Sequence, residues 1–531
     1  MYDYIIVGAG SAGCVLANRL SEDPGTQVLL LEAGPSDWHP FIHMPAGLAK
    51  LVGQKGVNWD YSTAAEPQLA GRHLWWPRGK VLGGSSSINA MCYIRGHQRD
   101  YDEWAALGAD GWHWDNVLPY FKRSEGNERG DSEYHNADGP LGVSDPRHKN
   151  PLSEVFVAAA RQAGHAATDD FNGATQEGFG WYQTTTRGGM RSSSARAYLT
   201  PVRQRPNLKV ITSATASRIT IEDGRATGVV YAIGGKGAHM AIARREVILS
   251  GGAINSPQLL MLSGIGPAEH LRQHGIVVRS DLPGVGGNLQ DHLDVCTMQR
   301  CTTDGVSYDQ SSDTLVALQY YLFKTGPGTS NIAEAGGFLR SALADDERPD
   351  IQFHFVPAQL DDHGRNRLPG NGYTLHACGL HPRSRGRVSL ASTNAADKPR
   401  IEAGYLSDPE GYDLKVMLEA LRLSREILAQ PAFAPYRGEE LFPGDALQDE
   451  ASLVDFIRRK AESIYHPVGT CRMGAADDPQ AVVDPQLRVR GIQALRVVDA
   501  SVMPKLIGGN TNAPTMMIAE RAADLILGRA A

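Results

Sequence analysis

The chain has 531 residues, enough for more than one hydrophobic core, and its 42% hydrophobic and 21% charged residues are ordinary for a globular protein. Its 52 basic and 59 acidic residues give a net charge of −7 without a basic block, so nucleic acid is not an expected partner. The six cysteines are scattered with no C-x-x-C pair, which favours reduced thiols in a cytoplasmic protein over disulfides or a zinc site.

No signal peptide is expected, because the first apolar run is only a short strand that ends before Gly8. No apolar run approaches the length needed to cross a bilayer. Composition leaves peripheral attachment to a membrane open. The expected location is therefore the cytoplasm, with the surface of the inner membrane as the alternative.

A nucleotide-binding motif follows that first strand. The run Tyr4-Ile-Ile-Val meets G-x-G-x-x-G with no spacer, and the apolar positions of a helix follow from Val15 to Leu20. A dinucleotide pyrophosphate needs backbone N–H groups at close range and the positive end of a helix dipole. Glycine permits both, so the motif predicts that a diphosphate lies against Gly8, Gly10, Ser11, Ala12 and Gly13.

A second strand is predicted over 27–31, and it ends at Glu32, nineteen residues after Gly13. A carboxylate at this distance can accept hydrogen bonds from the ribose hydroxyls of an adenosine, and it disfavours the 2′-phosphate of NADP. The motif and the acid together predict a dinucleotide site, but they suit NAD as well as FAD.

A segment rich in proline, glycine and aromatic residues covers 34–77, and we expect loops that wrap over a cofactor. The stretch 78–96 follows, with two adjacent glycines, three serines and Asn89. Backbone donors and small side chains in such a stretch can contact a phosphate or a planar ring. On its own the stretch also suits a flexible loop.

Two stretches give the sequence a resemblance to a known family. They are Gly79-Lys-Val-Leu-Gly-Gly-Ser-Ser-x-Ile-Asn89 and Gly252-Ala-Ile-Asn-Ser-Pro-Gln-Leu-Leu-Met-Leu-Ser-Gly-Ile-Gly266. Both resemble signatures of the glucose-methanol-choline (GMC) oxidoreductases, and the resemblance covers essentially the whole chain. Within that family the sequence resembles bacterial choline dehydrogenases and, more closely, FAD-dependent aliphatic alcohol dehydrogenases. The resemblance implies FAD as the cofactor.

The resemblance implies an α/β fold, α+β overall, with a Rossmann-like FAD-binding domain and a substrate domain built on an antiparallel sheet. We assign residues 1–309 to the FAD-binding region, 310–455 to the substrate-binding domain and 456–531 to a C-terminal return to the FAD domain. The runs 351–356, 373–378 and 386–390 alternate with period two, which predicts strands of a sheet covered on one face. Histidines there lack metal-ligand spacing, so no metal site is predicted.

The family pattern extends the set of residues predicted to bind FAD. The backbone of Ala216, on one of two strands predicted around a turn at 222–224, is expected to contact the adenine. A buried strand ending at Ser250 runs into a glycine turn, which is either a second backbone approach to the dinucleotide or a plain strand-to-helix junction. The remaining predicted contacts are Ala33, Leu82, Gly83, Ser85, Asn89, Ala90, Met91, Asp499, Ala500, Asn510 and Thr511.

The mode of FAD attachment also has a sequence expectation. In some family members a histidine just before the asparagine that matches Asn89 is bonded covalently to the flavin. Here that position is Ile88. The expected FAD is therefore non-covalent and dissociable.

The best catalytic candidates lie late in the sequence. Alcohol oxidation by a flavin needs a group that takes the hydroxyl proton while hydride leaves the carbon, and neutral imidazole suits this near pH 7. The resemblance aligns His466 with the active-site histidine of the family, and Asn510 with a second active-site position that is histidine or asparagine. The Asn510 amide can hydrogen-bond the substrate oxygen as charge develops. Its structural alternative is to cap the helix predicted from about residue 513, for which Asn512 is the nearer candidate.

The sequence therefore predicts FAD-dependent oxidation of a primary alcohol to the aldehyde, with electrons passed to a quinone or another acceptor. A choline dehydrogenase and an oxygen-using alcohol oxidase are the alternatives within redox chemistry. A hydroxynitrile lyase of the same fold, in which FAD is not reduced, is the alternative outside it. No G-x-S-x-G occurs, so a serine hydrolase is not expected.

Overall fold

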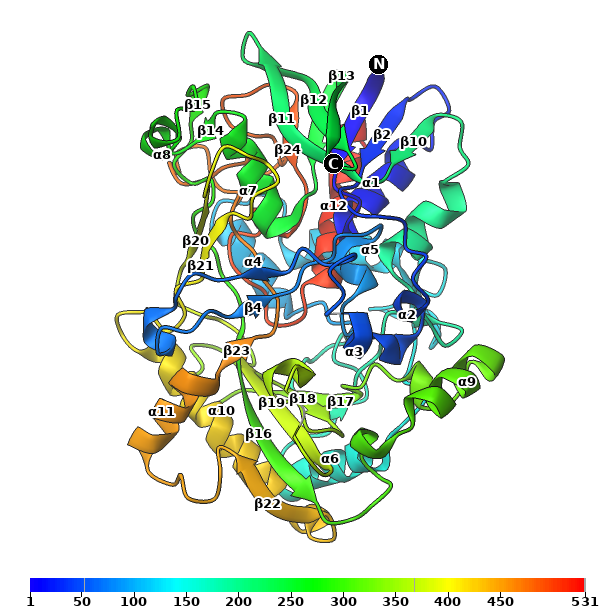
Figure 1. Ribbon diagram of the computed structural model, residues 1–531, viewed down its shortest axis with the longest axis vertical. Coiled ribbons are helices and arrows are strands. Elements are labelled where there is room, and N and C mark those ends of the chain that lie inside the picture. The colour runs from blue at the N-terminus through cyan, green and yellow to red at the C-terminus, as the bar shows by residue number, and fades with distance from the viewer. Residues whose placement is uncertain (52, 367, 530–531) are drawn as a thin grey trace.

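The first of two large sheets contains the opening strand, as the computed structural model in Figure 1 shows. The structure describes residues 1–51, 53–366 and 368–529. The strands of this sheet are β1 (Tyr2–Val7), β2 (Val28–Leu31), β10 (Leu208–Ile211), β11 (Ala214–Glu222), β12 (Arg225–Ile233), β13 (Lys236–Leu249) and β24 (Leu495–Val497). Their order is β10-β2-β1-β13-β12-β11, and β24 also pairs with β13. The predicted Rossmann-like core is thus present.

Strand β13 joins a parallel part of this sheet to an antiparallel part. Its last residues pair in parallel with β1, as Val247 does with Ile5, whereas its first half pairs antiparallel with β12, as Ala241 does with Val229. The predicted turn at 222–224 connects β11 to β12. The centre of β1 and all of β2 are buried, as expected for a parallel sheet that is covered on both faces.

Helices from distant parts of the chain cover this sheet next to the opening motif. Helix α1 (Ser11–Leu20) packs against α12 (Asn512–Leu527), which also packs against α5 (Trp114–Ser124). Arg19 on α1 and Arg123 on α5 each pair at 2.8 Å with the fully buried side chain of Glu520 on α12. The opening motif is therefore fastened to a helix from the other end of the chain.

The second large sheet is antiparallel, as predicted. Its strands are β7 (Gly178–Trp181), β16 (Leu293–Cys301), β17 (Ala335–Leu339), β18 (Ile351–Val356), β19 (Gly372–Gly379), β22 (Arg437–Phe442) and β23 (Glu462–Ser463). Their order is β22-β16-β19-β18-β17-β7, with β23 paired to β16.

The range 310–455 assigned to the substrate domain does not contain this sheet, because β7, β16 and β23 lie outside it. The run at 386–390 also differs from expectation. Its strand β20 (Arg387–Ser389) pairs with β21 (Arg400–Glu402) in a separate two-stranded sheet. Pairing between strands far apart in the chain leaves no signal in a single run, so periodicity identified strands without assigning them to a sheet.

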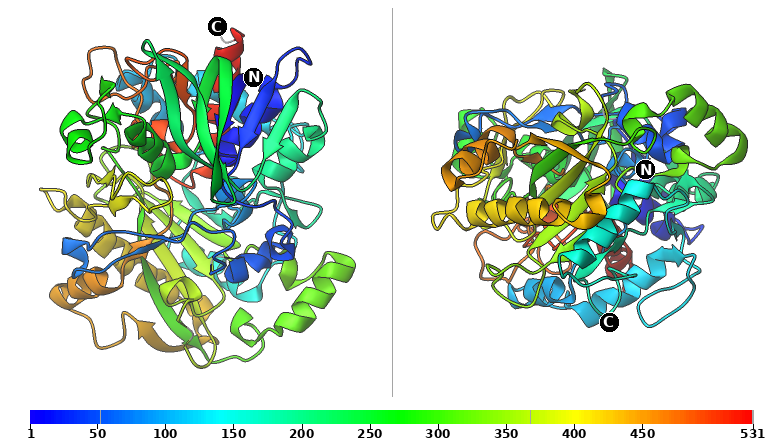
Figure 2. Two further views of the ribbon diagram at one scale, coloured as in Figure 1. Left: turned by 45° about the horizontal axis from the view of Figure 1, so that its top comes forward. Right: turned by 90° about the horizontal axis from the view of Figure 1, so that it is seen from below.

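The second sheet has an apolar face and a polar face. Phe353, Phe355, Leu375 and Ala377 belong to a buried cluster with residues of α6 (Pro151–Gln162) and α10 (Tyr412–Leu428). Figure 2, in the view from below, shows these two helices in front of the sheet. Because side chains alternate along a strand, Gln352, His354 and His376 project from the opposite face, toward the first sheet.

The segment 34–77, expected as loops, contains the short helices α2 (Pro40–His43) and α3 (Leu48–Leu51) and the two-residue strands β3 (Tyr61–Ser62) and β4 (Trp75–Trp76). Leu48, Trp59 and Trp75 from this segment line the cavity described below. The remaining helices of six residues or more are α4 (Gln98–Ala106), α7 (Gly252–Leu262), α8 (Ala268–Gln273), α9 (Asp313–Phe323) and α11 (Glu450–Lys460).

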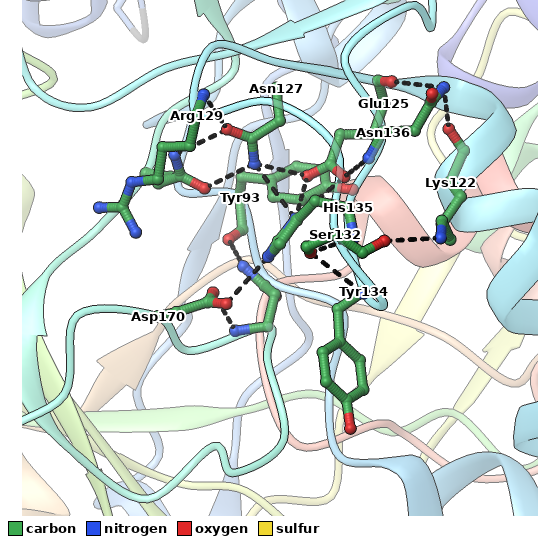
Figure 3. A network of polar contacts seen from close by, with 12 residues as sticks. Tyr93, Lys122, Glu125, Asn127, Arg129, Ser132, Tyr134, His135, Asn136 and Asp170 are labelled. Atoms are coloured by element: carbon green, nitrogen blue, oxygen red, sulfur yellow. Dashed lines mark hydrogen bonds and ion pairs between the residues drawn. The ribbon is translucent and has the colours of Figure 1, made fainter.

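A buried polar network fixes the chain between 93 and 170. Arg95 and Glu125 form a fully buried ion pair at 2.7 Å. Figure 3 shows His135 between Glu125 and Asp170, with its ring nitrogens 3.0 and 2.9 Å from their carboxylates. Burial lowers the pKa of His135, but hydrogen bonds to the two acids outweigh burial and raise the pKa to about 9. The imidazole is therefore charged at neutral pH and balances the two carboxylates.

Helix α9 stands away from the body of the molecule (Figures 1 and 2). Between Asp313 and Lys324 it carries no charged residue, and its large exposed side chains are Leu315, Leu318, Tyr321, Leu322 and Phe323. Across the described residues, no helix combines the length and hydropathy required to cross a membrane.

Candidate functional site

A cavity of about 410 Å³ is lined by residues of both large sheets. Both predicted catalytic residues, His466 and Asn510, line it. The predicted cofactor-binding residues that line it are Gly8, Gly10, Ser11, Ala12, Glu32, Ala33, Ser85, Asn89, Ala90, Met91, Ala216, Ser250, Asp499, Ala500, Asn510 and Thr511. Folding thus brings together motifs that are hundreds of residues apart in the sequence.

Three predicted cofactor residues do not line the cavity. Gly13 sits where α1 crosses β1, and a Cβ there would lie 1.9 Å from the Gly8 carbonyl oxygen. Gly83 has φ +88°, which favours glycine, and a Cβ there would lie 2.2 Å from Oγ of Ser87. The side chain of Leu82 is part of the core around the first sheet. These residues shape the walls of the cavity without facing it.

Two helices present bare N-termini to the cavity. Neither α1 nor α12 has a side-chain cap or an acidic residue in its first turn, and Gly10 and Ser11 of the one and Thr511 and Asn512 of the other line the cavity. Unpaired N–H groups and the positive dipole ends therefore face the cavity. Anions bind well at such ends.

The two acidic residues of the cavity wall hold backbone groups. The carboxylate of Glu32 accepts the N–H of Ala9 at 2.9 Å and of Gly34 at 2.8 Å. Burial raises the pKa of Glu32 to about 7. Asp499 accepts the N–H of Gly252 at 2.8 Å and the hydroxyl of Ser256 at 2.6 Å. Glu32 therefore fixes the turn after β1, and Asp499 fixes the start of α7.

Unpaired polar atoms test whether a dinucleotide fits these residues. Oγ of Ser250, Oδ1 of Asn331 and Nδ1 of His354 belong to wall residues, are buried, and have no partner in the described chain. Buried polar atoms are almost always hydrogen-bonded in folded proteins. With two bare helix termini beside them, these atoms fit a polar, anionic cofactor in the cavity.

The backbone around His466 is strongly constrained. Its N–H donates to Oδ1 of Asp291 at 2.6 Å, and Asp291 also accepts the hydroxyls of Ser463 and Tyr405. The preceding residue, Tyr465, has φ 70°, a left-handed conformation that is rare for a bulky residue. Such strain persists only where surrounding contacts impose it, and it is concentrated at functional sites.

His292 determines which nitrogen of His466 carries the proton. Nε2 of His292 lies 2.9 Å from the carbonyl oxygen of Leu380, which can only accept, so that nitrogen bears the hydrogen. Burial lowers the pKa of His292 to about 3, so the ring is neutral and its Nδ1 is an acceptor. Nδ1 of His466, 3.0 Å away, must donate to it. The lone pair of neutral His466 is therefore on Nε2.

Asn510 faces that lone pair. Its side-chain amide donates to Nε2 of His466 at 3.2 Å, and its Oδ1 accepts from the amide of Gln352 at 3.0 Å. Burial, with smaller contributions from His292 and His354, lowers the pKa of His466 well below its usual value. A neutral imidazole thus presents its basic nitrogen to the cavity beside an amide donor.

Several residues in or behind this wall were not predicted from the sequence. His292 precedes β16 without any motif, and Arg78, which donates to the Tyr465 carbonyl at 2.7 Å, lies just before the Gly83 stretch. His354 and His376 were assessed only as metal ligands. Their placement on strands that alternate in polarity was the available signal, because it puts both on the polar face of the sheet.

Asn512 differs from its expected role. It is the first residue of α12, and its Oδ1 accepts the hydroxyl of Ser11 at 2.8 Å instead of capping the helix. Within the described ranges, no group of three or more histidine, cysteine or acidic residues is placed to hold a metal ion.

Comparisons with known proteins show which family and which fold the chain resembles. The chain matches models described as GMC oxidoreductase over residues 2–294 and 382–519. It is 53% identical to an alcohol dehydrogenase (acceptor) of Pseudomonas putida, covering 99% of this chain and 96% of the relative. It is 49% identical to mitochondrial choline dehydrogenase of Homo sapiens, covering 100% and 90%. A variant of Aspergillus oryzae RIB40 formate oxidase, studied for FAD modification, has a TM-score of 0.92 at 29% identity over 99% and 98% of the two chains.

Proposed function

Because the chain belongs to the GMC oxidoreductase family, we propose that it is an FAD-dependent dehydrogenase that oxidises a primary alcohol to the aldehyde. The observation that carries this proposal is the pairing of His466 with Asn510 on the cavity wall, at 3.2 Å. Removal of a hydroxyl proton requires an unprotonated basic nitrogen within hydrogen-bond reach, and Nε2 of His466 is one.

In the proposed reaction, FAD supplies the acceptor for the hydride that leaves the alcohol carbon. Nε2 of His466 takes the hydroxyl proton, and His292 keeps the opposite nitrogen engaged so that the ring does not rotate. The Asn510 amide donates to the substrate oxygen and stabilises the charge that develops there. Arg78, which is anchored to the Tyr465 carbonyl, adds positive charge at the same end.

The proposed cofactor contacts follow from the wall residues. The N-terminus of α1, with Gly10 and Ser11, is placed to hold a diphosphate, and Glu32 retains lone pairs for a ribose hydroxyl. Ile88 lines the cavity at the position expected for a covalent histidine. We therefore infer a dissociable FAD, which denaturation of the holoenzyme should release into the supernatant as free flavin.

We infer that the electrons pass to a quinone or a similar carrier, and that the protein works in the cytoplasm or at the inner membrane surface. The support is the exposed helix α9, which carries no charged residue between Asp313 and Lys324. The helix ends eight residues before Asn331 and nine before Ile332, which line the cavity. A surface of this kind suits contact with an apolar phase that holds both an apolar alcohol and a quinone.

Anaerobic mixing of the holoenzyme with a panel of primary alcohols tests the proposal. Bleaching of the flavin absorbance is expected, with release of the aldehyde. A flavin that stays oxidised with every alcohol would overturn the redox assignment and favour a lyase of the same fold. Re-oxidation by air or by a soluble quinone then separates an oxidase from a dehydrogenase.

The His466→Ala variant tests the proposed base. Flavin reduction should slow by roughly two orders of magnitude or more, the usual effect of losing a positioned base, while FAD stays bound. His274→Ala is the matched control, because that histidine does not line the cavity and should leave the rate unchanged. A His466→Ala enzyme that reduces at the wild-type rate would remove His466 from the mechanism.

A further inference from the structure

The fixed charges around the catalytic end of the cavity are unsuited to a cation. Among described wall residues the acidic side chains are Glu32 and Asp499, and both already accept backbone N–H groups at the helix and strand ends around the cofactor-binding motifs. Arg78 is a positively charged wall residue close to His466. It donates a hydrogen bond to the carbonyl of the preceding residue, Tyr465, and its charge helps to lower the pKa of His466. A cationic substrate would therefore meet a like charge beside the catalytic base.

A carboxylate does lie directly behind this end of the wall, but it is covered. Oδ2 of Asp294 on β16 is 2.6 Å from Nδ1 of His376 on β19, and both side chains are buried. His376 faces the cavity, whereas Asp294 does not line it. The other oxygen of Asp294 is buried and has no hydrogen-bond partner among the described residues. His376 therefore stands between the cavity and the buried carboxylate of Asp294.

The two tryptophans of the wall are also in contact with the protein's own cations. The guanidinium of Arg365 lies 4.8 Å from the centroid of Trp75, and the ammonium of Lys80 lies 4.6 Å from that of Trp59. Quaternary ammonium groups are recognised by aromatic faces of this type. Here a lysine or an arginine of the protein already lies over each tryptophan ring, so a cationic substrate beside these rings is disfavoured.

The rest of this end is apolar. Its wall includes Ile332, Ala333, Val356, Leu360 and Ile464. Apolar walls with a few placed polar groups are what an uncharged, partly aliphatic ligand requires.

Resting on the proposed alcohol oxidation, we propose that this cavity selects uncharged alcohols over quaternary ammonium alcohols, and that His376 sets the preference by covering Asp294. His376 is thus a specificity-determining residue. Removing its ring opens a path from the cavity to a buried carboxylate, and such a carboxylate attracts a cation strongly because little water screens it. Specificity for the uncharged alcohol arises in part because His376 keeps the Asp294 carboxylate out of contact with the substrate.

Two isosteric substrates test the proposal. Choline and 3,3-dimethylbutan-1-ol have the same shape, but the second has carbon in place of the charged nitrogen. Anaerobic flavin reduction gives kcat/KM for each. If one of the two compounds is not oxidised, both are instead compared as inhibitors of the fastest alcohol of the panel, by their inhibition constants. The wild-type enzyme should favour the uncharged alcohol by about tenfold or more.

The His376→Ala variant should shift the ratio of the two values toward choline by about tenfold. The double variant His376→Ala with Asp294→Asn is the matched control, since it opens the same space without the charge, and its ratio should return toward wild type. Flavin content and the unfolding temperature of each variant report whether it folds. A purely structural role for His376 would change both substrates alike and leave the ratio fixed.

Two results would overturn the proposal. One is a wild-type enzyme that handles choline as well as its uncharged isostere, and the other is a ratio that does not change in His376→Ala. Failure of the proposed function looks different, because then no alcohol of the panel bleaches the flavin.

Discussion

The imidazole of His466 is held in one tautomer by a chain of contacts that ends at a backbone carbonyl. Leu380 fixes the proton of His292, His292 fixes the proton of His466, and Asn510 faces the lone pair that remains. Each step follows from the number of donors and acceptors that the groups possess. The base is therefore oriented before a substrate arrives.

The rate of flavin reduction should depend on pH through His466. Burial lowers the pKa of His466 well below its usual value, so the neutral, active form persists to lower pH than for an exposed histidine. The rate constant measured by anaerobic stopped flow should be constant from about pH 6 to about pH 9 and fall only at lower pH. A decline that begins near neutral pH would mean that a different group, or an exposed His466, is the base.

The sequence identified residues whose chemistry depends on short spacing. The glycine motif and Glu32 could be predicted locally, because the motif joins a strand to a helix and Glu32 directly follows the next strand. Asn510 was identified by family resemblance. His292, Arg78 and His376 could not, because their roles depend on contacts such as the one between His292 and His466, which are 174 residues apart. Family resemblance identified His466, but the proton it carries is determined by tertiary contacts.

The contact between β1 and α1 is as close as the fold permits. A Cβ on Gly13 would overlap the Gly8 carbonyl, whereas a Cβ on Gly10 would have no neighbour nearer than 3.9 Å. Two glycines of one motif therefore serve different purposes. Gly13 allows the helix to pack on the strand, and Gly10 leaves room in the cavity.

Gly13→Ala and Gly10→Ala should separate these purposes. Gly13→Ala should lower the stability of the FAD-free protein by about 1–3 kcal/mol, because overpacking forces strand and helix apart. Gly10→Ala should change that stability by less than about 0.5 kcal/mol. We expect it to weaken FAD binding by about tenfold, because its methyl group enters the cavity. Thermal unfolding and flavin titration measure the two effects, and equal losses of stability would contradict the assignment.

Elements were predicted better than their assembly. The parallel core strands and the hairpin around 222–224 are as expected from local pattern. The second sheet was predicted as antiparallel, but its strands β7, β16 and β23 lie outside the range 310–455, and β20 pairs with β21 in a separate sheet. Period-two alternation marks a half-buried strand, but it does not tell which strand is its neighbour.

On the scale of the whole molecule, helix α9 stands out because most of its large apolar side chains are exposed and not packed in a core. Its inward contact is Tyr320, whose hydroxyl donates to the His43 carbonyl at 2.8 Å. Leu315, Leu322 and Phe323 are 65%, 63% and 69% exposed. An apolar helix surface of this kind is favoured at a membrane interface, where aromatic side chains also concentrate.

Sedimentation of the holoenzyme with phospholipid vesicles should recover the protein in the lipid fraction. Replacing Leu315, Leu322 and Phe323 together by Gln should return it to the supernatant, because apolar area drives such binding. Val277→Gln is the matched control, since Val277 is 76% exposed and lies between α8 and β15, away from α9. Equal recovery of both variants with the vesicles would place the contact elsewhere.

The packing of α1 against α12 affects the order in which the protein folds during synthesis. The hydroxyl of Ser11 and the amide of Asn512 meet across 501 residues of sequence, and Glu520 secures the same two helices. Chains fold from the N-terminus as they leave the ribosome, yet the opening motif lacks its contacts with α12 until the last part of the chain has been synthesised. FAD is therefore expected to be captured after translation has passed α12, so that a nascent chain does not hold a reactive flavin in a half-built site.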